Sequence, residues 1–292
     1  MRPDREALRA ELEAFLAGRL GAGLRLVPFE TGSAKVVYRA ERPDGPPLFV
    51  KLVSDAPGAR LKRLTDALDL PFVAKVAHLL PWRDGRSVLC QVWQKGALVP
   101  PERMNAAQTA ALVEATRRLQ ARLGPGDALL PPRDPRASYA VVADFARRHP
   151  VARPFLRALL DIPESARTYD GLPLATIHGD QHYENYLFDG DDVSAIMDFE
   201  AVTRGLAVQD LAYAVARRYY KVRLTAAARA NLDARFRQMV AARPGGREWT
   251  VAVNLWRLLF AARRLKSHPH FGPVACLVWK RDRALRRMLS LL

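Results

Sequence analysis

Strand-like and helix-like patterns occupy different parts of this chain, and their order limits the folds that it can adopt. Short apolar runs separated by turn residues dominate the first 95 residues, which also contain one or two helical stretches, whereas helical spacing dominates after Gly96 and is the only pattern from residue 206 onward. A short β interlude interrupts the helical part, at 174–199. This order is typical of an α+β protein. We therefore predict a bilobal molecule, with a small β-rich N-terminal lobe (1–95) and a larger, mostly helical C-terminal lobe (96–292).

The same patterns predict the individual elements. Helices are expected at 5–19, 58–69, 104–123, 137–148, 151–160, 206–219, 224–242, 247–266 and 273–291. Strands are expected at 23–30, 35–41, 47–54, 72–82, 86–96, 174–180, 186–190 and 193–199. Turn residues at Arg83-Asp84-Gly85 and at Gly190-Asp191 mark two hairpins. The first five strands are predicted to form one small antiparallel sheet.

The composition is that of a globular protein. Of the 292 residues, 49% are hydrophobic and 26% charged, so a substantial core is feasible. No apolar run reaches the roughly 18–20 residues that cross a bilayer, and the N-terminal segment lacks the apolar core of a signal peptide. Cys90 and Cys276 are too few for a disulfide framework or a cysteine metal site. We expect a cytoplasmic protein with no membrane span.

One segment, IHGDQHYENYLF (177–188), gathers many polar side chains between apolar residues. Asp180 and Asn185 stand five positions apart in it, and Asp198 follows an apolar strand pattern thirteen positions later. Phosphoryl transfer needs a carboxylate at the acceptor hydroxyl, oxygen ligands on Mg²⁺ and a lysine on the phosphates. The catalytic segment of protein kinases has the same Asp-x4-Asn spacing, followed by Asp-Phe. We predict that Asp180 is the catalytic base and that Asn185 and Asp198 bind Mg²⁺.

A lysine near the N-terminus suits the phosphate-binding role. Lys51 lies in the strand pattern LFVKLV, where apolar neighbours on both sides favour a pinned side chain over a solvated one. Kinases pair this lysine with a glutamate on the next helix, but the helix predicted after Lys51 contains no glutamate. Asp55, Asp66 or Asp69 could replace it, or the lysine could remain unpaired. The missing glutamate leaves open a nucleotide-binding protein with weak or no transferase activity.

Two further segments are expected to contact the nucleotide. The loop pattern ETGSAKVVY offers Gly32 and Ser33, where backbone N–H groups and the serine hydroxyl would bind phosphate. No Walker pattern is present. The purine of ATP or GTP is expected at the segment CQVWQKG, against backbone groups between Val92 and Gln94.

Three more polar residues of the central region have less specific roles. His178 and His182 stand four positions apart, but no His-Glu-x-x-His pattern of a zinc site is present. We expect His178 to brace the loop, and His182 to brace it or to contact phosphate or substrate. Glu200 is expected to face the metal or the substrate.

Four motifs in this order, TGSAKVVYRA, HGDQHYEN, IMDFE and VQDLAYAV, resemble those of the aminoglycoside phosphotransferase and choline kinase superfamily. The last of them places an aspartate, here Asp210, on a downstream helix. The resemblance covers most of the chain. It implies a bilobal protein-kinase-like fold and transfer of the γ-phosphate of ATP or GTP to a hydroxyl of a small molecule.

The net charge of +16 limits the substrate more than the fold. Between Thr203 and Leu292 there are 19 Lys and Arg against 4 Asp and Glu, and this excess either attracts an anionic partner or decorates solvated helix faces. Because aminoglycosides are polycations, we expect a neutral or anionic acceptor: a sugar, an amino alcohol or a phosphorylated metabolite. An aminoglycoside is the alternative. Nucleic acid is a disfavoured partner, since the aromatic residues of this region fall at apolar helix positions.

Overall fold

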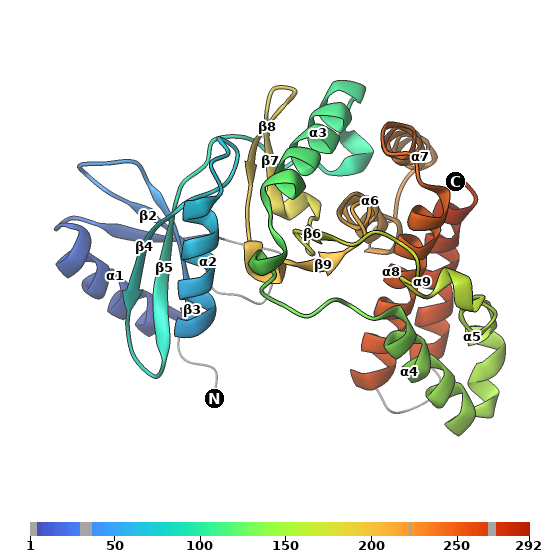
Figure 1. The fold of residues 1–292 in the computed structure, drawn as a ribbon. Coiled ribbons are helices and arrows are strands. Elements are labelled where there is room, and N and C mark those ends of the chain that lie inside the picture. Colours follow the sequence, from blue (N-terminus) through green and yellow to red (C-terminus); the bar gives the residue numbers. More distant parts are fainter. Residues whose placement is uncertain (1–4, 30–36, 222, 268–272) are drawn as a thin grey trace. The chain divides into compact units, whose positions relative to one another are not determined.

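The computed structural model describes residues 5–29, 37–221, 223–267 and 273–292 (Figure 1). Contacts within the chain divide it into two compact units. The first unit consists of Met1–Lys95 and Ala195–Glu200, and the second of Gly96–Ser194 and Ala201–Leu292. The first unit is therefore built from two separate stretches of the sequence.

A five-stranded antiparallel sheet forms the centre of the first unit, in the order β1-β2-β3-β5-β4. Its elements are α1 (Arg5–Leu20), β1 (Arg25–Phe29), β2 (Val37–Glu41), β3 (Leu48–Ser54), α2 (Asp55–Ala67), β4 (Val76–Pro81) and β5 (Arg86–Val92). The β4–β5 hairpin turns through Asp84 and Gly85, which both have positive φ, as tight hairpins often require. Each of the five strands lies within the range predicted from the sequence.

Alternation along β3 directs its side chains to the two faces of the sheet. Leu48 and Val50 are buried in one cluster with leucines of α1. On the other face, Val53 lies so close to Gly58 of α2 that a Cβ added at the glycine would come within 2.9 Å of the valine side chain. Lys51 has the same parity as Val53, so it projects from the face that α2 covers.

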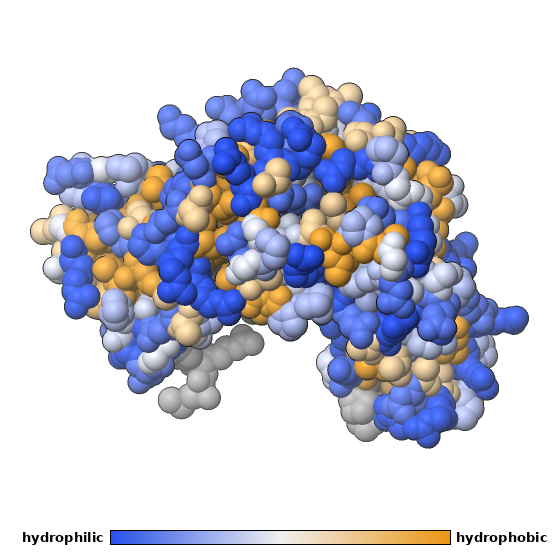
Figure 2. All heavy atoms as spheres, viewed as in Figure 1, coloured by the Kyte–Doolittle hydropathy of each residue, from blue (hydrophilic) through white to orange (hydrophobic). Residues whose placement is uncertain are grey.

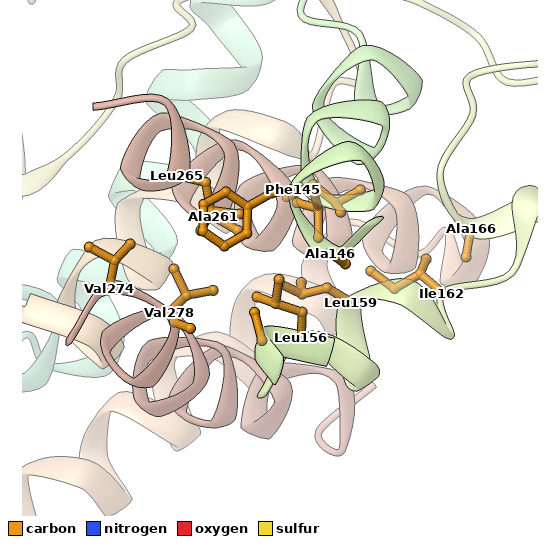
Figure 3. Close-up of a cluster of buried hydrophobic side chains, with 14 residues drawn as sticks. Phe145, Ala146, Leu156, Leu159, Ile162, Ala166, Ala261, Leu265, Val274 and Val278 are labelled. Carbon is orange, nitrogen blue, oxygen red and sulfur yellow. The ribbon is translucent and has the colours of Figure 1, made fainter. Parts of the chain in front are cut away.

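The second unit is mostly helical. Its helices are α3 (Ala106–Arg122), α4 (Pro135–Arg148), α5 (Arg153–Leu160), α6 (Gln209–Lys221), α7 (Ala226–Ala242), α8 (Gly246–Ser267) and α9 (Pro273–Leu289). Buried side chains of α4, α5, α8 and α9 form one core, in which Phe145, Leu156, Leu159, Leu265 and Val278 lie together (Figure 3). Burial of each large apolar side chain is worth about 1.5–3 kcal/mol, so this cluster holds the four helices together. Hydrophilic residues cover much of the face seen in Figure 2.

Four short strands flank the polar motif. Strand β6 (Ala175–Ile177) pairs with β9 (Thr203–Gly205), and β7 (Tyr186–Asp189) pairs with β8 (Asp192–Ile196). The β7–β8 hairpin turns at Gly190, as predicted, with φ of +61°. The sequence does not predict β9, because three residues are too few to show the alternation of a strand.

The end of β8 belongs to the first unit. Ile196 forms a parallel bridge with Val73: its N–H donates to the Phe72 carbonyl at 2.6 Å, and its own carbonyl accepts from the Ala74 N–H at 3.2 Å. These bonds fix the stretch Ala195–Glu200 alongside the segment that precedes β4. Asp198 and Glu200 therefore lie in the same unit as Lys51.

The predicted α+β fold is confirmed. The helices of the described ranges begin and end within three residues of the predicted positions. In those ranges, no helix combines the length and the hydropathy that a bilayer span requires.

Candidate functional site

Lys51 is buried in the first unit with its ammonium group between two carboxylates. Its Nζ lies 2.9 Å from Asp198 Oδ1 and 2.7 Å from Glu200 Oε1, while the lysine itself is only 4% exposed. A buried ammonium group is costly unless it is paired, so the two carboxylates stabilise its charged form. Both carboxylates remain partly exposed. With both ionised, the three groups carry one negative charge in excess, which suits an additional cation.

The acidic partner of Lys51 comes from a different segment than the sequence suggests. The three candidate aspartates have other surroundings: Asp66 is bonded to Lys62 at 2.8 Å, Asp55 accepts the hydroxyl of Ser87, and Asp69 is exposed. Among the described residues, the ion pairs of Lys51 are with Asp198 and Glu200. Glu200 therefore supplies the glutamate that α2 lacks.

Asp198 has an uncommon backbone conformation, with φ of +60°. Few residues other than glycine adopt this left-handed region, although aspartate is among those that tolerate it. Such conformations persist where the surrounding structure determines them, and they concentrate at functional sites. Here the conformation follows directly on β8 and accompanies the contact between the Asp198 carboxylate and Lys51.

In the second unit, a buried carboxylate holds the start of the polar motif. Asp210 of α6, 1% exposed, accepts the N–H groups of His178 at 2.9 Å and Gly179 at 2.8 Å. Gly179 has φ of +79°, and a Cβ added there would lie 2.2 Å from the Ala201 carbonyl oxygen, so a side chain does not fit. These contacts fix the backbone immediately before Asp180. The sequence marks Asp210 only as part of a motif, and its apolar neighbours on α6 are the signal that it is buried and bonded.

The two histidines of the motif are both buried but have different contacts. His178 Nδ1 accepts the N–H of Asp180 at 3.2 Å, which braces the loop from within. His182 Nδ1 accepts the N–H of Glu184 at 3.3 Å, and its Nε2 lies 3.7 Å from Asp180 Oδ2. Because Nδ1 of His182 is an acceptor, the proton of the neutral ring is on Nε2, the nitrogen near Asp180.

Asn185 is oriented by two hydrogen bonds within the motif. Its side-chain Nδ2 donates to the Asp180 carbonyl at 2.8 Å, and its backbone N–H donates to the His182 carbonyl at 2.7 Å. The amide nitrogen is thereby used, so the amide oxygen is the side-chain atom that could bind a cation. Oxygen is the ligand atom that Mg²⁺ prefers.

The part of the chain that the structure describes holds no group of three or more His, Cys, Asp or Glu side chains close enough to bind a metal ion. Mg²⁺ is usually bound through one or two carboxylates and substrate phosphates, with several waters, instead of by an all-protein cage. The residue types fit that mode, since the first unit offers the carboxylate of Asp198 and the second unit the amide oxygen of Asn185.

The segments expected to contact the nucleotide are described only in part. Gly32 and Ser33 lie outside the described residues. In the segment expected to bind the base, the N–H of Val92 donates to the Lys75 carbonyl and that of Trp93 to the Pro47 carbonyl, at 3.2 and 3.1 Å. Both N–H groups are used within the unit, so a base would have to contact other groups of this segment, such as the Val92 carbonyl or the Gln94 side chain.

Comparisons with known proteins give one family and a set of similar folds. A family model described as the phosphotransferase enzyme family matches residues 25–251. A search of curated proteins finds no match.

Solved structures of three phosphotransferases resemble the whole chain or most of it. A thermostable mutant of aminoglycoside phosphotransferase APH(4)-Ia, in a ternary complex with ADP and hygromycin B, is 13% identical, with a TM-score of 0.65 over 95% of this chain and 98% of the other. Macrolide 2′-phosphotransferase MphH from Brachybacterium faecium is 15% identical, with a TM-score of 0.60 over 95% and 97%. Aminoglycoside phosphotransferase APH(3'')-Id from Streptomyces rimosus is 20% identical, with a TM-score of 0.53 over 85% and 98%. At these identities the similarity concerns the fold.

Proposed function

Since the chain belongs to the phosphotransferase enzyme family and is a small-molecule kinase, we propose that it transfers the γ-phosphate of ATP or GTP to a hydroxyl group of its acceptor. The observation that supports this most directly is the buried Lys51 ammonium group between Asp198 and Glu200. Kinases place a lysine paired with an acid on the phosphates of the nucleotide and an aspartate on its Mg²⁺. A structural neighbour in complex with ADP supports a nucleoside phosphate as the donor.

The first unit would bind the donor. Lys51 would contact phosphate oxygens, and Glu200 would keep its ammonium group charged and in place. Asp198 would bind Mg²⁺, which when bound neutralises charge on the phosphates. Gly32 and Ser33 are proposed for the phosphates and Gln94 for the base, together with Val92, whose carbonyl accepts the Gln94 side-chain amide.

The second unit would supply the catalytic base and a further metal ligand. The Asp180 side chain is about one-third exposed (33%), so a substrate hydroxyl can reach its carboxylate. Asp180 would accept the proton of that hydroxyl, a role worth about 10²–10⁴-fold in rate. Asn185 would bind Mg²⁺ through its amide oxygen, while His178 and Asp210 keep the loop in position.

The acceptor is proposed to be a neutral or anionic hydroxyl compound. From Thr203 onward the sequence has 19 basic residues and only 4 acidic ones. Each unscreened contact between like charges at about 4 Å costs about 1 kcal/mol even in water. A polycation is therefore disfavoured. The names of the structural neighbours favour a second candidate, an aminoglycoside or a macrolide.

A screen of acceptors tests this proposal. The protein would be incubated with Mg²⁺ and either ATP or GTP, together with sugars, amino alcohols, phosphorylated metabolites, aminoglycosides or macrolides, and nucleotide turnover would be measured. We expect at least one acceptor to stimulate turnover, and Asp198→Ala to abolish Mg²⁺-dependent nucleotide affinity. Asp192→Ala, which changes an exposed aspartate at the start of β8, is the control. Tight nucleotide binding without turnover in any mixture would instead identify a nucleotide-binding protein.

A further inference from the structure

Four arginines of the second unit lie among aromatic rings near the candidate catalytic base. Several helix arginines are bonded to carboxylates: Arg217 to Glu184, Arg218 to Glu102, Arg257 to Asp282 and Arg287 to Asp233. Several other described arginines have no ion pair with a carboxylate. Four of these lie over neighbouring aromatic rings or close to one another's charge, and we call them the arginine cluster: Arg133, Arg263, Arg264 and Arg281.

A row of aromatic rings connects Arg133 to the candidate catalytic base. The Arg133 guanidinium lies over the ring of Trp256, 4.8 Å from its centre. Trp256 stacks on Tyr213 with 3.9 Å between ring centres, and Tyr213 and His182 are arranged edge-to-face with 6.0 Å between ring centres. His182 in turn lies 3.7 Å from the Asp180 carboxylate. All of these residues belong to the second unit.

Two more members of the cluster, Arg264 and Arg281, lie near a second pair of aromatic rings. Tyr220 of α6 lies 4.9 Å from Phe260 of α8. The Arg281 guanidinium is 5.6 Å from the first ring centre and 6.0 Å from the second, and that of Arg264 is 5.8 Å from Phe260. Burial raises the pKa of Tyr220, while Arg217, Arg263 and Arg281 oppose that shift and Asp180 adds to it. Tyr220 is therefore within electrostatic reach of Asp180 and of two members of the cluster, Arg263 and Arg281.

The cluster is unfavourable for the protein without a ligand. Arg133 Nη1 is buried and has no hydrogen-bond partner among the described residues, and an unsatisfied buried donor is costly. Burial and the neighbouring charge of Arg263 lower the pKa of Arg133, although Asp180 and Asp210 act in the opposite direction, and burial and Arg264 lower the pKa of Arg281. An anion placed among these groups would supply the missing acceptor and reduce their mutual repulsion.

We propose that the arginine cluster binds an anionic group, a carboxylate or a phosphate, of the acceptor, and that the enzyme therefore selects anionic hydroxyl compounds. Guanidinium groups suit this role because they bind carboxylate and phosphate oxygens in pairs. The inference rests on the proposed function, because it assumes that a hydroxyl group of the same acceptor molecule reaches Asp180.

Matched acceptors test the selectivity. Glycerol would be compared with glycerol 3-phosphate and glycerate, glucose with glucose 6-phosphate and gluconate, and a cationic set would comprise ethanolamine and an aminoglycoside. We expect stimulated nucleotide turnover with an anionic member, and little with its neutral parent or with the cations. Preference for a neutral or cationic acceptor would overturn the inference while leaving the proposed function in place.

Arginine variants test the site itself. Arg263→Gln changes an exposed residue and is expected to fold, and the double variant Arg133→Gln/Arg263→Gln removes both neighbouring charges. We expect the double variant to raise the KM of the best anionic acceptor about 10-fold or more, as for a lost charged hydrogen bond, with the KM of the nucleotide unchanged. Arg229→Gln, an exposed arginine on α7, should behave like the unchanged protein. An unaltered acceptor KM in the double variant would contradict the assignment.

A binding measurement separates this inference from the proposed function. Inorganic phosphate would be titrated while tryptophan fluorescence is followed, because Trp256 lies directly under Arg133. We expect saturable binding that weakens about 10-fold or more in the double variant and is unchanged in Arg229→Gln. Such binding without any transfer would overturn the proposed function but support the anion site. Equal phosphate affinity in the unchanged protein, the double variant and Arg229→Gln would contradict the anion site.

Discussion

Lys51 is a buried cation whose replacement should weaken the binding of the nucleotide. Lys51→Met keeps the apolar stem but leaves Asp198 and Glu200 without their shared counter-charge. A hydrogen bond to a charged group is worth about 1.5–3 kcal/mol, so we expect the KM of the nucleotide to rise about 10–100-fold. Lys62→Met, at a more exposed lysine of α2, is the control. Equal KM values in Lys51→Met and the unchanged protein would exclude Lys51 from the phosphate site.

Cys90 should be unreactive in the folded protein. It is fully buried on β5, and burial raises the pKa of its thiol to about 12, so almost no thiolate is present near neutral pH. Titration with a thiol reagent at pH 8 should modify the partly exposed Cys276 first and Cys90 only on unfolding. Rapid modification of both thiols without denaturant would contradict the packing of this face of the sheet.

At the residue scale, the sequence identifies Lys51 but not its partners. Apolar flanks on both sides mark Lys51 as a pinned side chain. Its ion pairs, however, join β3 to a stretch far along the chain, and they depend on the bridge between Ile196 and Val73. No local pattern contains that bridge, so the pairing with Glu200 could not be predicted.

At the scale of elements, α8 and α9 are joined by a buried ion pair. Arg257 and Asp282 are 3% and 4% exposed, and Nε lies 2.7 Å from Oδ1. Breaking a buried pair by removing one partner costs about 3–5 kcal/mol, because it leaves an uncompensated charge inside the protein. We expect Asp282→Asn to lower the free energy of unfolding by about that amount, measured by urea denaturation.

The control for that experiment is an exposed pair on α4. Asp144 is bonded to Arg147 and Arg148 at the surface, where such pairs contribute little. Asp144→Asn should therefore leave the denaturation midpoint unchanged. An unaltered midpoint in Asp282→Asn as well would show that the pair between α8 and α9 does not stabilise the fold.

The long elements follow from the sequence, and the short ones do not. A helix such as α7 or α8 repeats its apolar spacing over several turns, which limits the error at its ends. Strand β9 has three residues and exists because β6 pairs with it. The left-handed backbone at Asp198 likewise depends on contacts with other segments, and no glycine at this position indicates it in the sequence.

At the scale of the whole molecule, the net charge of +16 does not predict nucleic-acid binding. Several C-terminal arginines form ion pairs with carboxylates of the protein, including Arg218, Arg257 and Arg287, so their charges are already neutralised. We expect weak binding to a DNA duplex, with a shallow dependence on salt between 50 and 200 mM, measured by fluorescence anisotropy. A fall of about 10³-fold or more over that range would indicate six or more phosphate contacts and would contradict this expectation.

The central claim is that Asp180 acts on the acceptor while other residues bind the nucleotide. Its most direct test measures kcat and nucleotide affinity in Asp180→Asn, with Asp189→Asn, an exposed aspartate at the end of β7, as the control. The account predicts a kcat lower by about 10²–10⁴-fold with nucleotide affinity retained, and no change in the control. Full turnover in Asp180→Asn would contradict it.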